Sequence, residues 1–204
     1  MERLNLNRCD VFKEYLSPDE QVTLRAEIRT VVKTAPLFQP ETRWGKPMSV
    51  RMTSAGRYGW ISDRSGYRYS KTHPRGGPWG DLPKTASKIW SELVSINREP
   101  DCCLINYYTE KAKMGLHQDR DEQAIDAPVL SVSLGDACLF RYGGKNRNDP
   151  TKSIKLQSGD VLLLSGASRM IFHGVDRIYP GTSTLLKSEG RINLTLRRVT
   201  KSYA

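Results

Sequence analysis

Two of the three histidines in this chain stand in surroundings that suit a metal ion. His117 is followed two positions later by Asp119, and residues two apart in an extended segment point to the same face. An imidazole and a carboxylate can therefore approach one ion together. His173 follows 54 positions later in the run Met-Ile-Phe-His-Gly. Two histidines and one carboxylate form the facial ligand set of non-haem iron(II), which leaves coordination positions open for a cosubstrate and for oxygen.

These three residues alone leave two interpretations open. A His-x-Asp pair occurs by chance in many sequences, and His173 could equally be a core histidine whose ring nitrogens are satisfied by hydrogen bonds. The remaining histidine, His73, lies in a loop rich in Pro and Gly, and we expect it to be an ordinary loop residue.

The segment 191–197 adds a second chemical feature, because its residues alternate strictly between apolar and polar types. The apolar face consists of Ile192, Leu194 and Leu196, and the polar face of Arg191, Asn193, Thr195 and Arg197. An edge strand with one solvated face would show the same pattern. However, two guanidinium groups on one face also suit a dicarboxylate, since each can bind one carboxylate through paired hydrogen bonds. In segment 102–108, Asn106 and Tyr108 share a face and could supply neutral donors.

The charge balance favours a polyanionic partner. Lys and Arg number 32 against 22 Asp and Glu, giving a net charge of +10. Nucleic acid is the leading candidate for such a basic chain, and a basic protein without this role is the alternative. No apolar run is long enough to cross a bilayer, and no basic amphipathic helix suggests a membrane surface, so we expect no membrane partner.

The N-terminal segment lacks the continuous apolar stretch of a secretory signal, which argues against secretion. The four cysteines form no Cys-x-x-Cys pair, and two of them are adjacent. We therefore expect reduced, buried cysteines in a cytoplasmic protein.

Two helices are expected before the region of strands. Ser17-Pro18-Asp19-Glu20 has the pattern of a capping box with proline at the first helical position, and Pro36 ends that helix. Its apolar face consists of Leu24, Ile28 and Val31. A second helix is expected from residue 83 to about residue 97, and its buried residues are Ala86, Trp90, Leu93 and Val94.

Between these helices, residues 38–79 form an irregular stretch rich in Gly, Pro, Arg and aromatic residues, of the kind that makes lids and binding loops. Trp60, Tyr67 and Tyr69 alternate there with arginines. They could be covering aromatics on a sheet, or a nucleic-acid surface in which rings stack on bases and guanidiniums bind phosphates.

From residue 102 onward the sequence predicts short strands separated by turns, at 102–108, 129–134, 138–142, 153–156, 161–165, 170–174 and 191–199. This pattern predicts a mainly β protein, an antiparallel sandwich or jelly roll with the two helices supporting one sheet. The length fits one globular domain. Within it we distinguish an N-terminal extension and helix packed on the sheet at 1–35, a lid at 36–80, and a catalytic core with one helix at 81–204.

A resemblance to a known family rests on motifs that occur in order between about residues 36 and 198. They are 48–53 (MSVRMT), 59–70 (GWISDRSGYRYS), 103–108 (CLINYY), 116–122 (LHQDRDE), 129–135 (VLSVSLG), 140–144 (FRYGG), 147–150 (RNDP), 168–174 (SRMIFHG) and 191–197 (RINLTLR). Together they resemble the AlkB family of iron(II)- and 2-oxoglutarate-dependent nucleic-acid dealkylating dioxygenases, and they are most similar to its bacterial members. The resemblance implies a double-stranded β-helix, a cupin-like jelly roll.

The resemblance also implies roles for individual residues. The implied Fe(2+) ligands are His117, Asp119 and His173. The implied 2-oxoglutarate contacts are Asn106, Tyr108, Arg191, Asn193 and Arg197, with Arg191 at the distal carboxylate and Arg197 near the C1 carboxylate. The implied substrate pocket contains Met52, Trp60, Tyr67, Asp121, Glu122 and Arg147, with Trp60 stacked on the damaged base opposite His117.

The implied reaction uses O2 and 2-oxoglutarate as cosubstrates. It hydroxylates the alkyl carbon of bases such as 1-methyladenine and 3-methylcytosine, and releases an aldehyde and the repaired base. The expected partner is single-stranded or flipped-out alkylated DNA, with RNA as a second substrate, and the expected state is a monomer. Tyr107, Glu110, Lys111 and Arg120 depart from the residues typical of the family.

Two other classes of function remain to be weighed. One is a related iron oxygenase that acts on a protein or a small molecule, against which the aromatic and basic lid argues. The other is a non-enzymatic nucleic-acid-binding β domain, against which the three ligands and the arginine strand argue.

Overall fold

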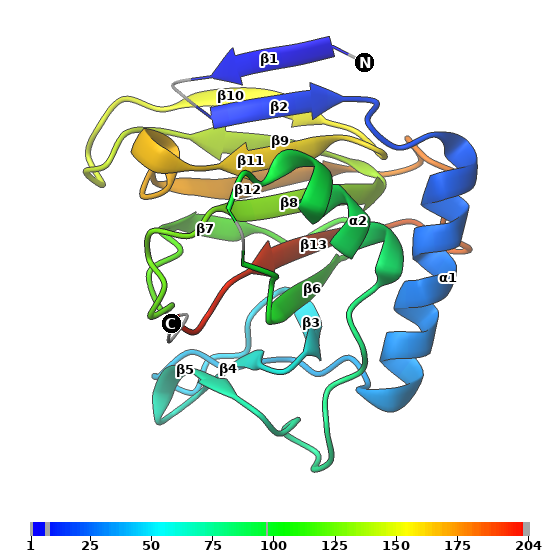
Figure 1. Ribbon diagram of the computed structural model, residues 1–204, viewed down its shortest axis with the longest axis vertical. Helices are drawn as coiled ribbons and strands as arrows, with labels where there is room; N and C mark the ends of the chain where they lie inside the picture. The colour runs from blue at the N-terminus through cyan, green and yellow to red at the C-terminus, as the bar shows by residue number, and fades with distance from the viewer. Residues whose placement is uncertain (1, 7–8, 97, 202–204) are drawn as a thin grey trace.

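Two antiparallel sheets stacked face to face form the body of the protein (Figure 1). The computed structural model describes residues 2–6, 9–96 and 98–201. One sheet has seven strands and the other has four, and a separate two-stranded hairpin lies below them in the view of Figure 1. The predicted mainly β class and the jelly-roll architecture are confirmed.

The larger sheet has the order β1-β2-β11-β8-β13-β6-β3. Its strands are β1 (Glu2–Leu6), β2 (Cys9–Lys13), β3 (Arg51–Gly56), β6 (Cys102–Tyr108), β8 (Val129–Gly135), β11 (Val161–Leu164) and β13 (Arg191–Arg197). The smaller sheet has the order β10-β9-β12-β7, with β7 (Met114–His117), β9 (Ala137–Tyr142), β10 (Lys152–Leu156) and β12 (His173–Tyr179). The separate hairpin joins β4 (Gly59–Asp63) to β5 (Gly66–Ser70).

Two helices cover the outer face of the larger sheet, α1 (Pro18–Thr34) and α2 (Lys84–Leu93) (Figure 1). The predicted capping box of α1 is present, because the Ser17 side chain accepts from the Glu20 amide and the Glu20 carboxylate accepts from the Ser17 amide. The core beneath the helices contains Leu24, Ile28, Val31, Ala86, Ile89, Trp90, Ile105, Leu130, Leu194 and Leu196. Neither helix within the described residues is long and apolar enough to cross a membrane.

A second core lies between the two sheets. It contains Val129, Leu162 and Leu164 of the larger sheet and Cys138, Phe140, Leu156, Val175 and Ile178 of the smaller one. The four cysteines are buried and free, as predicted. Burial raises the pKa of the Cys102 thiol to about 12, so it remains protonated and behaves as an apolar residue.

The predicted strand at 170–174 is wrong. Residues Gly166–Ser168 form a short 3-10 turn, and β12 begins only at His173. The turn is favoured because the Ser168 hydroxyl donates to the Ser165 carbonyl and accepts from the Ser165 amide. The structure thus places His173 at the start of its strand.

Residues 38–79 contain more regular structure than predicted, because β3, β4 and β5 all lie there. The strand β3 pairs with β6 in the larger sheet, so this part of the predicted lid belongs to the core. Polar residues fill buried positions of β3, among them Thr53 and Ser54, and this hides the apolar alternation that marks a strand. At the N-terminus, β1 and β2 also extend the larger sheet. The helix α2 ends at Leu93, and residue 97, its predicted end, lies outside the described residues.

A buried carboxylate fixes the start of β13, from which Arg191 points inward. Asp136 is 1% exposed and accepts hydrogen bonds from three backbone amides. The donors are the amides of Thr182 at 3.0 Å, Ser183 at 3.2 Å and Gly190 at 2.7 Å. Asp136 therefore closes the loop between β12 and β13 and sets the position of the residue that follows it.

We predict that Asp136→Ala lowers the free energy of unfolding by at least about 3 kcal/mol, because each buried donor left without a partner costs about 1–3 kcal/mol. Asp126→Ala is the matched control, since its carboxylate is exposed and pairs only at the surface with Arg98. It should change stability by less than about 1 kcal/mol. Urea denaturation of both variants measures the difference, and equal losses would contradict the role of Asp136.

Candidate iron and 2-oxoglutarate site

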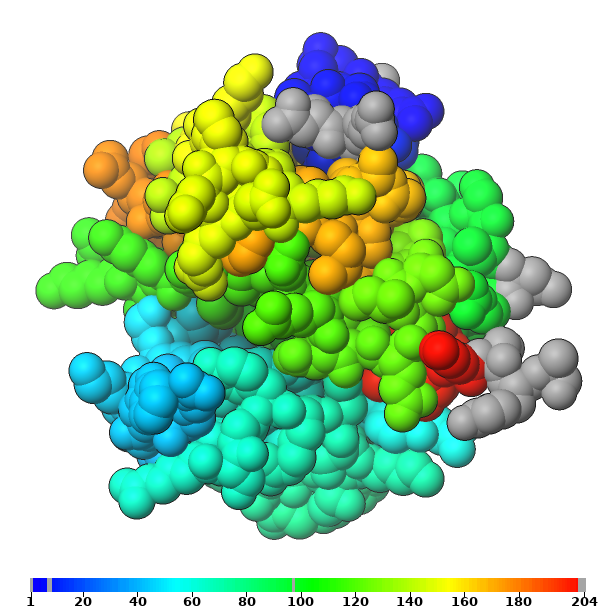
Figure 2. Space-filling model, turned by 90° about the vertical axis from the view of Figure 1, so that its left-hand side faces the viewer, coloured from blue at the N-terminus to red at the C-terminus, as the bar shows by residue number. Residues whose placement is uncertain are grey.

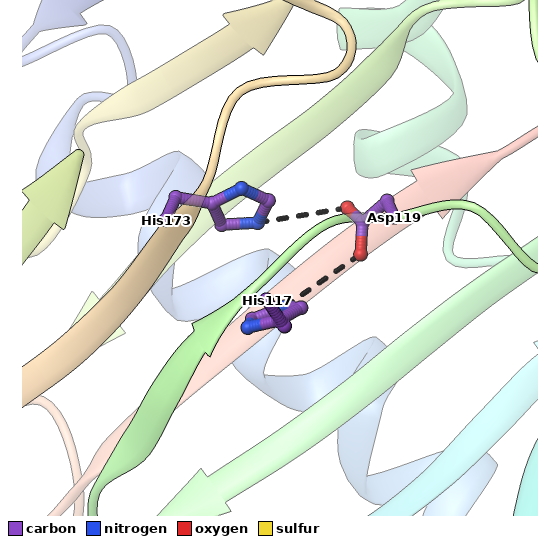
Figure 3. A group of neighbouring side chains, drawn as sticks. All are labelled: His117, Asp119 and His173. Carbon is purple, nitrogen blue, oxygen red and sulfur yellow. Dashed lines mark ion pairs between the residues drawn. The ribbon is translucent and has the colours of Figure 1, made fainter. Parts of the chain in front are cut away.

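His117, Asp119 and His173 meet at one end of the smaller sheet (Figure 3). Because β7 and β12 pair in antiparallel register, His117 lies directly opposite His173, and their ring centroids are 4.5 Å apart. Asp119 follows β7, and its two carboxylate oxygens each lie 3.7 Å from the Nε2 atom of one histidine. One candidate ligand atom from each residue lies within 4.8 Å of the others. The metal-site prediction therefore has the geometry that it needs.

The hydrogen bonds of both histidines prepare them to bind a metal. The Nδ1 atom of His117 lies 2.9 Å from the Gly115 carbonyl oxygen, and that of His173 lies 3.1 Å from the Ile171 carbonyl oxygen. A carbonyl oxygen only accepts, so each Nδ1 carries the proton and each Nε2 presents a lone pair. Figure 3 shows both rings turned toward the carboxylate. Such backbone contacts fix the tautomer and ring orientation of metal-bound histidines.

The charges of the site favour the protonation states of a metal centre. Burial and the neighbouring His117 lower the pKa of His173 to about 4, so this ring is neutral at pH 7. Burial opposes ionisation of Asp119, but Arg197 and the two histidines outweigh it and hold the pKa of the carboxyl well below its usual range. A neutral imidazole and an ionised carboxylate are the forms that bind iron(II).

A cavity of about 490 Å³ opens beside these three residues, between the sheets and the β4–β5 hairpin. Figure 2 views the molecule from the side, with green and yellow core segments above the cyan hairpin region. The predicted site residues that line the cavity are Met52, Trp60, Tyr67, Asn106, Tyr108, His117, Asp119, Asp121, Arg147, His173, Arg191, Asn193 and Arg197. A volume of this size suits a small cosubstrate together with one nucleobase.

Arg191 is the clearest sign of an anion site in the cavity. Its side chain is 1% exposed, yet among the described residues it makes only one side-chain hydrogen bond, from Nη2 to the Ser133 hydroxyl at 2.8 Å. Its Nε and Nη1 atoms are buried without a hydrogen-bond partner, and no carboxylate of the described residues forms an ion pair with it. A buried charge without compensation is strongly unfavourable, so these two donors fit a carboxylate supplied from outside the chain.

The neighbouring residues extend the polar surface around Arg191. Tyr108 lies opposite Arg191 in the pairing of β13 with β6, and Asn106 lies opposite Asn193. The Oδ1 atom of Asn106 is buried without a partner. Asn193 differs, because its amide donates to the Ser131 hydroxyl at 2.7 Å and its carbonyl accepts from the Thr195 hydroxyl at 3.0 Å. Asn193 therefore helps to order the strand as well as lining the cavity.

Arg197 lies at the other end of the same face and contacts the metal site directly. Its Nη2 atom donates to Asp119 Oδ1 at 2.7 Å, and Asp119 is 5% exposed. Its Nε atom, like two donors of Arg191, is buried without a partner. The two arginines, six residues apart on one face of β13, thus present free donors at two points of a single cavity, which fits a dicarboxylate between them.

The hairpin closes the other side of the cavity. Trp60 and Tyr67 stack with centroids 5.5 Å apart and planes at 23°. The Trp60 indole donates from Nε1 to Asp121 Oδ2 at 3.0 Å. Three residues predicted to contact the substrate therefore lie together at the mouth of the cavity.

Glu122 does not line the cavity, although it was predicted as a substrate contact. It is 6% exposed, and its carboxylate is held by Arg169 at 3.1 Å and Arg197 at 3.0 Å. Sequence reasoning missed Arg169, whose only signal was its position inside the motif 168–174. His73 lies in a loop as expected, but it is 2% exposed and packs against Trp79 at 5.0 Å between ring centroids.

Known proteins share both the sequence and the fold. A sequence model of the 2OG-Fe(II) oxygenase superfamily matches residues 8–197. The alpha-ketoglutarate-dependent dioxygenase AlkB homolog of Caulobacter vibrioides is 50% identical over 190 residues, 93% of this chain and 86% of that protein. The alpha-ketoglutarate-dependent dioxygenase AlkB of Escherichia coli strain K12 is 39% identical over 180 residues, 86% of this chain and 83% of that protein. The solved structure of OsALKBH1 has a TM-score of 0.82 and 33% identity, covering 97% of this chain and 100% of that one.

The chain belongs to the AlkB family of 2OG-Fe(II) oxygenases. This AlkB-family protein is an iron(II)- and 2-oxoglutarate-dependent dioxygenase that uses O2. The residues present fit iron and 2-oxoglutarate. Three candidate ligand atoms lie close together, and the buried donors of Arg191 and Arg197 can bind a dicarboxylate. When bound, iron and 2-oxoglutarate together supply the power to oxidise an unactivated carbon–hydrogen bond.

We predict that His117→Ala abolishes stoichiometric iron(II) binding with little loss of stability. The reason is that His117 is half-exposed and that, within the described part of the chain, its only hydrogen bond is to a backbone carbonyl. Asp119→Ala should also abolish binding. It should in addition destabilise the protein by about 3–5 kcal/mol, since it removes one of the two carboxylates that pair with the buried Arg197. Anaerobic iron titration and thermal unfolding separate the two effects, and near-normal iron binding by His117→Ala would refute the ligand assignment.

Arg191→Ala is expected to weaken 2-oxoglutarate binding by at least about tenfold, because charge-assisted hydrogen bonds contribute about 1.5–3 kcal/mol. Arg141→Ala is the control, since its guanidinium pairs with Asp176 and does not line the cavity. Calorimetric titration of 2-oxoglutarate into the Mn(II)-loaded protein gives both dissociation constants. An unchanged constant in Arg191→Ala would place the dicarboxylate elsewhere.

Proposed function

We propose that this dioxygenase repairs alkylation damage by removing N-linked alkyl groups, such as those of 1-methyladenine and 3-methylcytosine, from single-stranded DNA. The alkyl carbon is hydroxylated, and the product breaks down to an aldehyde and the unmodified base. RNA is the second substrate that the same cavity would admit. The observation that carries this proposal is the placement of Trp60, Tyr67 and Asp121 around the mouth of the cavity that holds the iron site.

The mouth of the cavity has the chemistry needed to select a cationic base. Alkylation at a ring nitrogen gives adenine or cytosine a positive charge. The face of the Trp60 indole attracts a cation, and the exposed Asp121 carboxylate adds an opposite charge that can also accept from an exocyclic amino group. An undamaged neutral base would gain less from both groups.

Access to the cavity requires that the base leave its stack. Two of the three candidate iron ligands lie inside the molecule, with Asp119 5% and His173 8% exposed. A base within a duplex cannot reach that depth, so a single strand or a flipped nucleotide is the expected substrate. The net charge of +10 favours such a polyanion. Arg120 and Arg147 line the cavity, and the Arg147 guanidinium lies 5.1 Å from the centroid of the Phe172 ring.

Each part of the chain then has a distinct task in the reaction. His117, Asp119 and His173 hold iron(II), and Arg191 and Arg197 bind the two carboxylates of 2-oxoglutarate. The apolar wall contributed by Met52, Leu104 and Val175 excludes water from the region where the alkyl group enters. The β4–β5 hairpin holds the base over the iron. We also propose that the protein acts as a monomer in the cytoplasm, without a membrane partner.

The rival within the superfamily is an oxygenase that acts on a protein or a small molecule. A stacked pair of aromatic rings beside a carboxylate suits a planar cationic base better than a flexible peptide side chain. We therefore favour the nucleic-acid substrate.

The decisive experiment follows the mass of a single-stranded oligonucleotide that carries one 1-methyladenine. The protein is loaded with iron(II) and 2-oxoglutarate without oxygen and is then exposed to air. Loss of one methyl group, with formaldehyde and succinate released in equal amounts, is the expected result. Oligoribonucleotides of the same sequence are run in parallel. Succinate formation without any loss of mass from either nucleic acid would refute the proposal.

For the lid, we predict that Trp60→Ala weakens binding of the methylated strand by about 5–100-fold, since stacking contributes about 1–3 kcal/mol per base. The uncoupled conversion of 2-oxoglutarate should persist, because Trp60 contacts neither carboxylate-binding arginine. Trp60→Phe should retain most of the affinity. Binding is compared for cationic 1-methyladenine and a neutral alkylated base, and the cationic base should lose more. Equal losses for both bases, together with a lower melting temperature, would make Trp60 a packing residue.

A further inference from the structure

A buried group of four charged side chains connects the iron site with the interior of the protein. Arg169 Nη2 contacts Glu122 Oε2 at 3.1 Å, Arg197 Nη1 contacts Glu122 Oε1 at 3.0 Å, and Arg197 Nη2 contacts Asp119 Oδ1 at 2.7 Å. All four residues are less than a tenth exposed. Two cations and two anions alternate, so the group is neutral as a whole, as a buried network must be to be stable.

Tyr69 brings the lid into this network. It lies on β5, one strand of the β4–β5 hairpin, and not on the core sheets. Its hydroxyl lies 2.6 Å from Glu122 Oε1 and 2.8 Å from Arg197 Nη1. A carboxylate only accepts and a guanidinium only donates, so the hydroxyl donates to Glu122 and accepts from Arg197. The directions of both hydrogen bonds are thereby fixed.

The result is that Arg197 is held from three sides. Its Nη2 atom donates to Asp119, while its Nη1 atom donates to both Glu122 and the Tyr69 hydroxyl. The remaining donor, Nε, is buried and has no partner among the described residues. Arg197 lines the cavity, and its plane is set by partners that do not belong to β13. A shift of the lid would therefore change the orientation of this donor.

We propose that Tyr69 is a positioning residue that couples the seating of the lid to the binding of 2-oxoglutarate through Arg197. This inference rests on the proposed function, since it assigns the free donor of Arg197 to a carboxylate of the cosubstrate. Tyr69 itself does not line the cavity. It acts by holding Arg197 and Glu122 in place when the hairpin is seated.

The hairpin makes polar contacts with Asp121 and Glu122, two consecutive residues that follow Asp119 in the chain. The two contacts differ in environment. Trp60 meets Asp121 at an exposed position at the mouth of the cavity. Tyr69 meets Glu122 inside the protein, where the carboxylate is fully buried. A base can rearrange the outer contact as it enters, while the inner contact keeps the hairpin attached to the cosubstrate site. Binding of nucleic acid to the lid and binding of 2-oxoglutarate should therefore strengthen each other, because such linkage is reciprocal.

The test compares two variants that each remove a tyrosine hydroxyl that donates to a glutamate. Tyr69→Phe removes the hydroxyl that reaches the network. Tyr15→Phe is the control, because its hydroxyl donates to Glu92 and Tyr15 does not line the cavity. The dissociation constant of 2-oxoglutarate is measured by calorimetry on the full-length Mn(II)-loaded protein, with and without a single-stranded oligonucleotide that carries 1-methyladenine. Melting temperatures are recorded for both variants.

In Tyr69→Phe the 2-oxoglutarate dissociation constant should rise about tenfold, which corresponds to 1.4 kcal/mol. The tightening of 2-oxoglutarate binding by the oligonucleotide should be largely lost. In Tyr15→Phe both quantities should stay within about twofold of the wild type. An unchanged constant in Tyr69→Phe, with or without a lower melting temperature, overturns the proposal, as does an equal rise in both variants. Failure of the wild-type protein to bind 2-oxoglutarate would instead refute the proposed function.

Discussion

The buried ion pair between Arg197 and Asp119 is the interaction on which the rest of the site depends. It joins the last strand of the larger sheet to the loop that follows β7, and so joins the cosubstrate surface to the iron ligands. Burial opposes the ionisation of this carboxylate, so it needs a compensating cation close by. Arg197 keeps Asp119 ionised, and the same guanidinium is kept in place by Glu122 and Tyr69. One side chain thereby joins the candidate metal site, the hairpin and the proposed dicarboxylate site.

The sheets explain why the remaining residues converge. Antiparallel pairing of β7 with β12 places His117 opposite His173, and pairing of β13 with β6 places Arg191 opposite Tyr108. Because side chains alternate between the faces of a strand, every second residue of β13 enters the cavity and the others pack beneath α1 and α2. The apolar face contributes the stability that allows the polar face to keep unpaired donors. Arg191 is the extreme case, a buried cation that the chain leaves for a ligand to neutralise.

The lid follows a different rule from the core. The β4–β5 hairpin pairs with neither large sheet and is attached mainly through side chains, with Trp60 at the mouth and Tyr69 at the network. Two-stranded hairpins are marginally stable alone, so its position is set by these contacts. This makes the hairpin the natural element to respond to a base, while the iron ligands stay on paired strands and the loop beside them.

The sequence by itself determined the features that local chemistry encodes. The capping box at Ser17, the alternation of 191–197 and the His-x-Asp pair each depend on only a few neighbouring residues. The motifs along the chain indicated the family and most of the residues that line the cavity. The sequence did not predict β3, where Thr53 and Ser54 fill buried positions, or the true start of β12. Only the tertiary structure decided which side chains become partners. Glu122 was predicted as a substrate contact beside Asp121, yet the fold turns it inward between Arg169 and Arg197. In the sequence Tyr69 is one more aromatic residue of the lid. In the structure β5 places its hydroxyl against Glu122 and Arg197. A local pattern specifies the face on which a side chain lies, whereas the partner on that face comes from strands far apart in the chain.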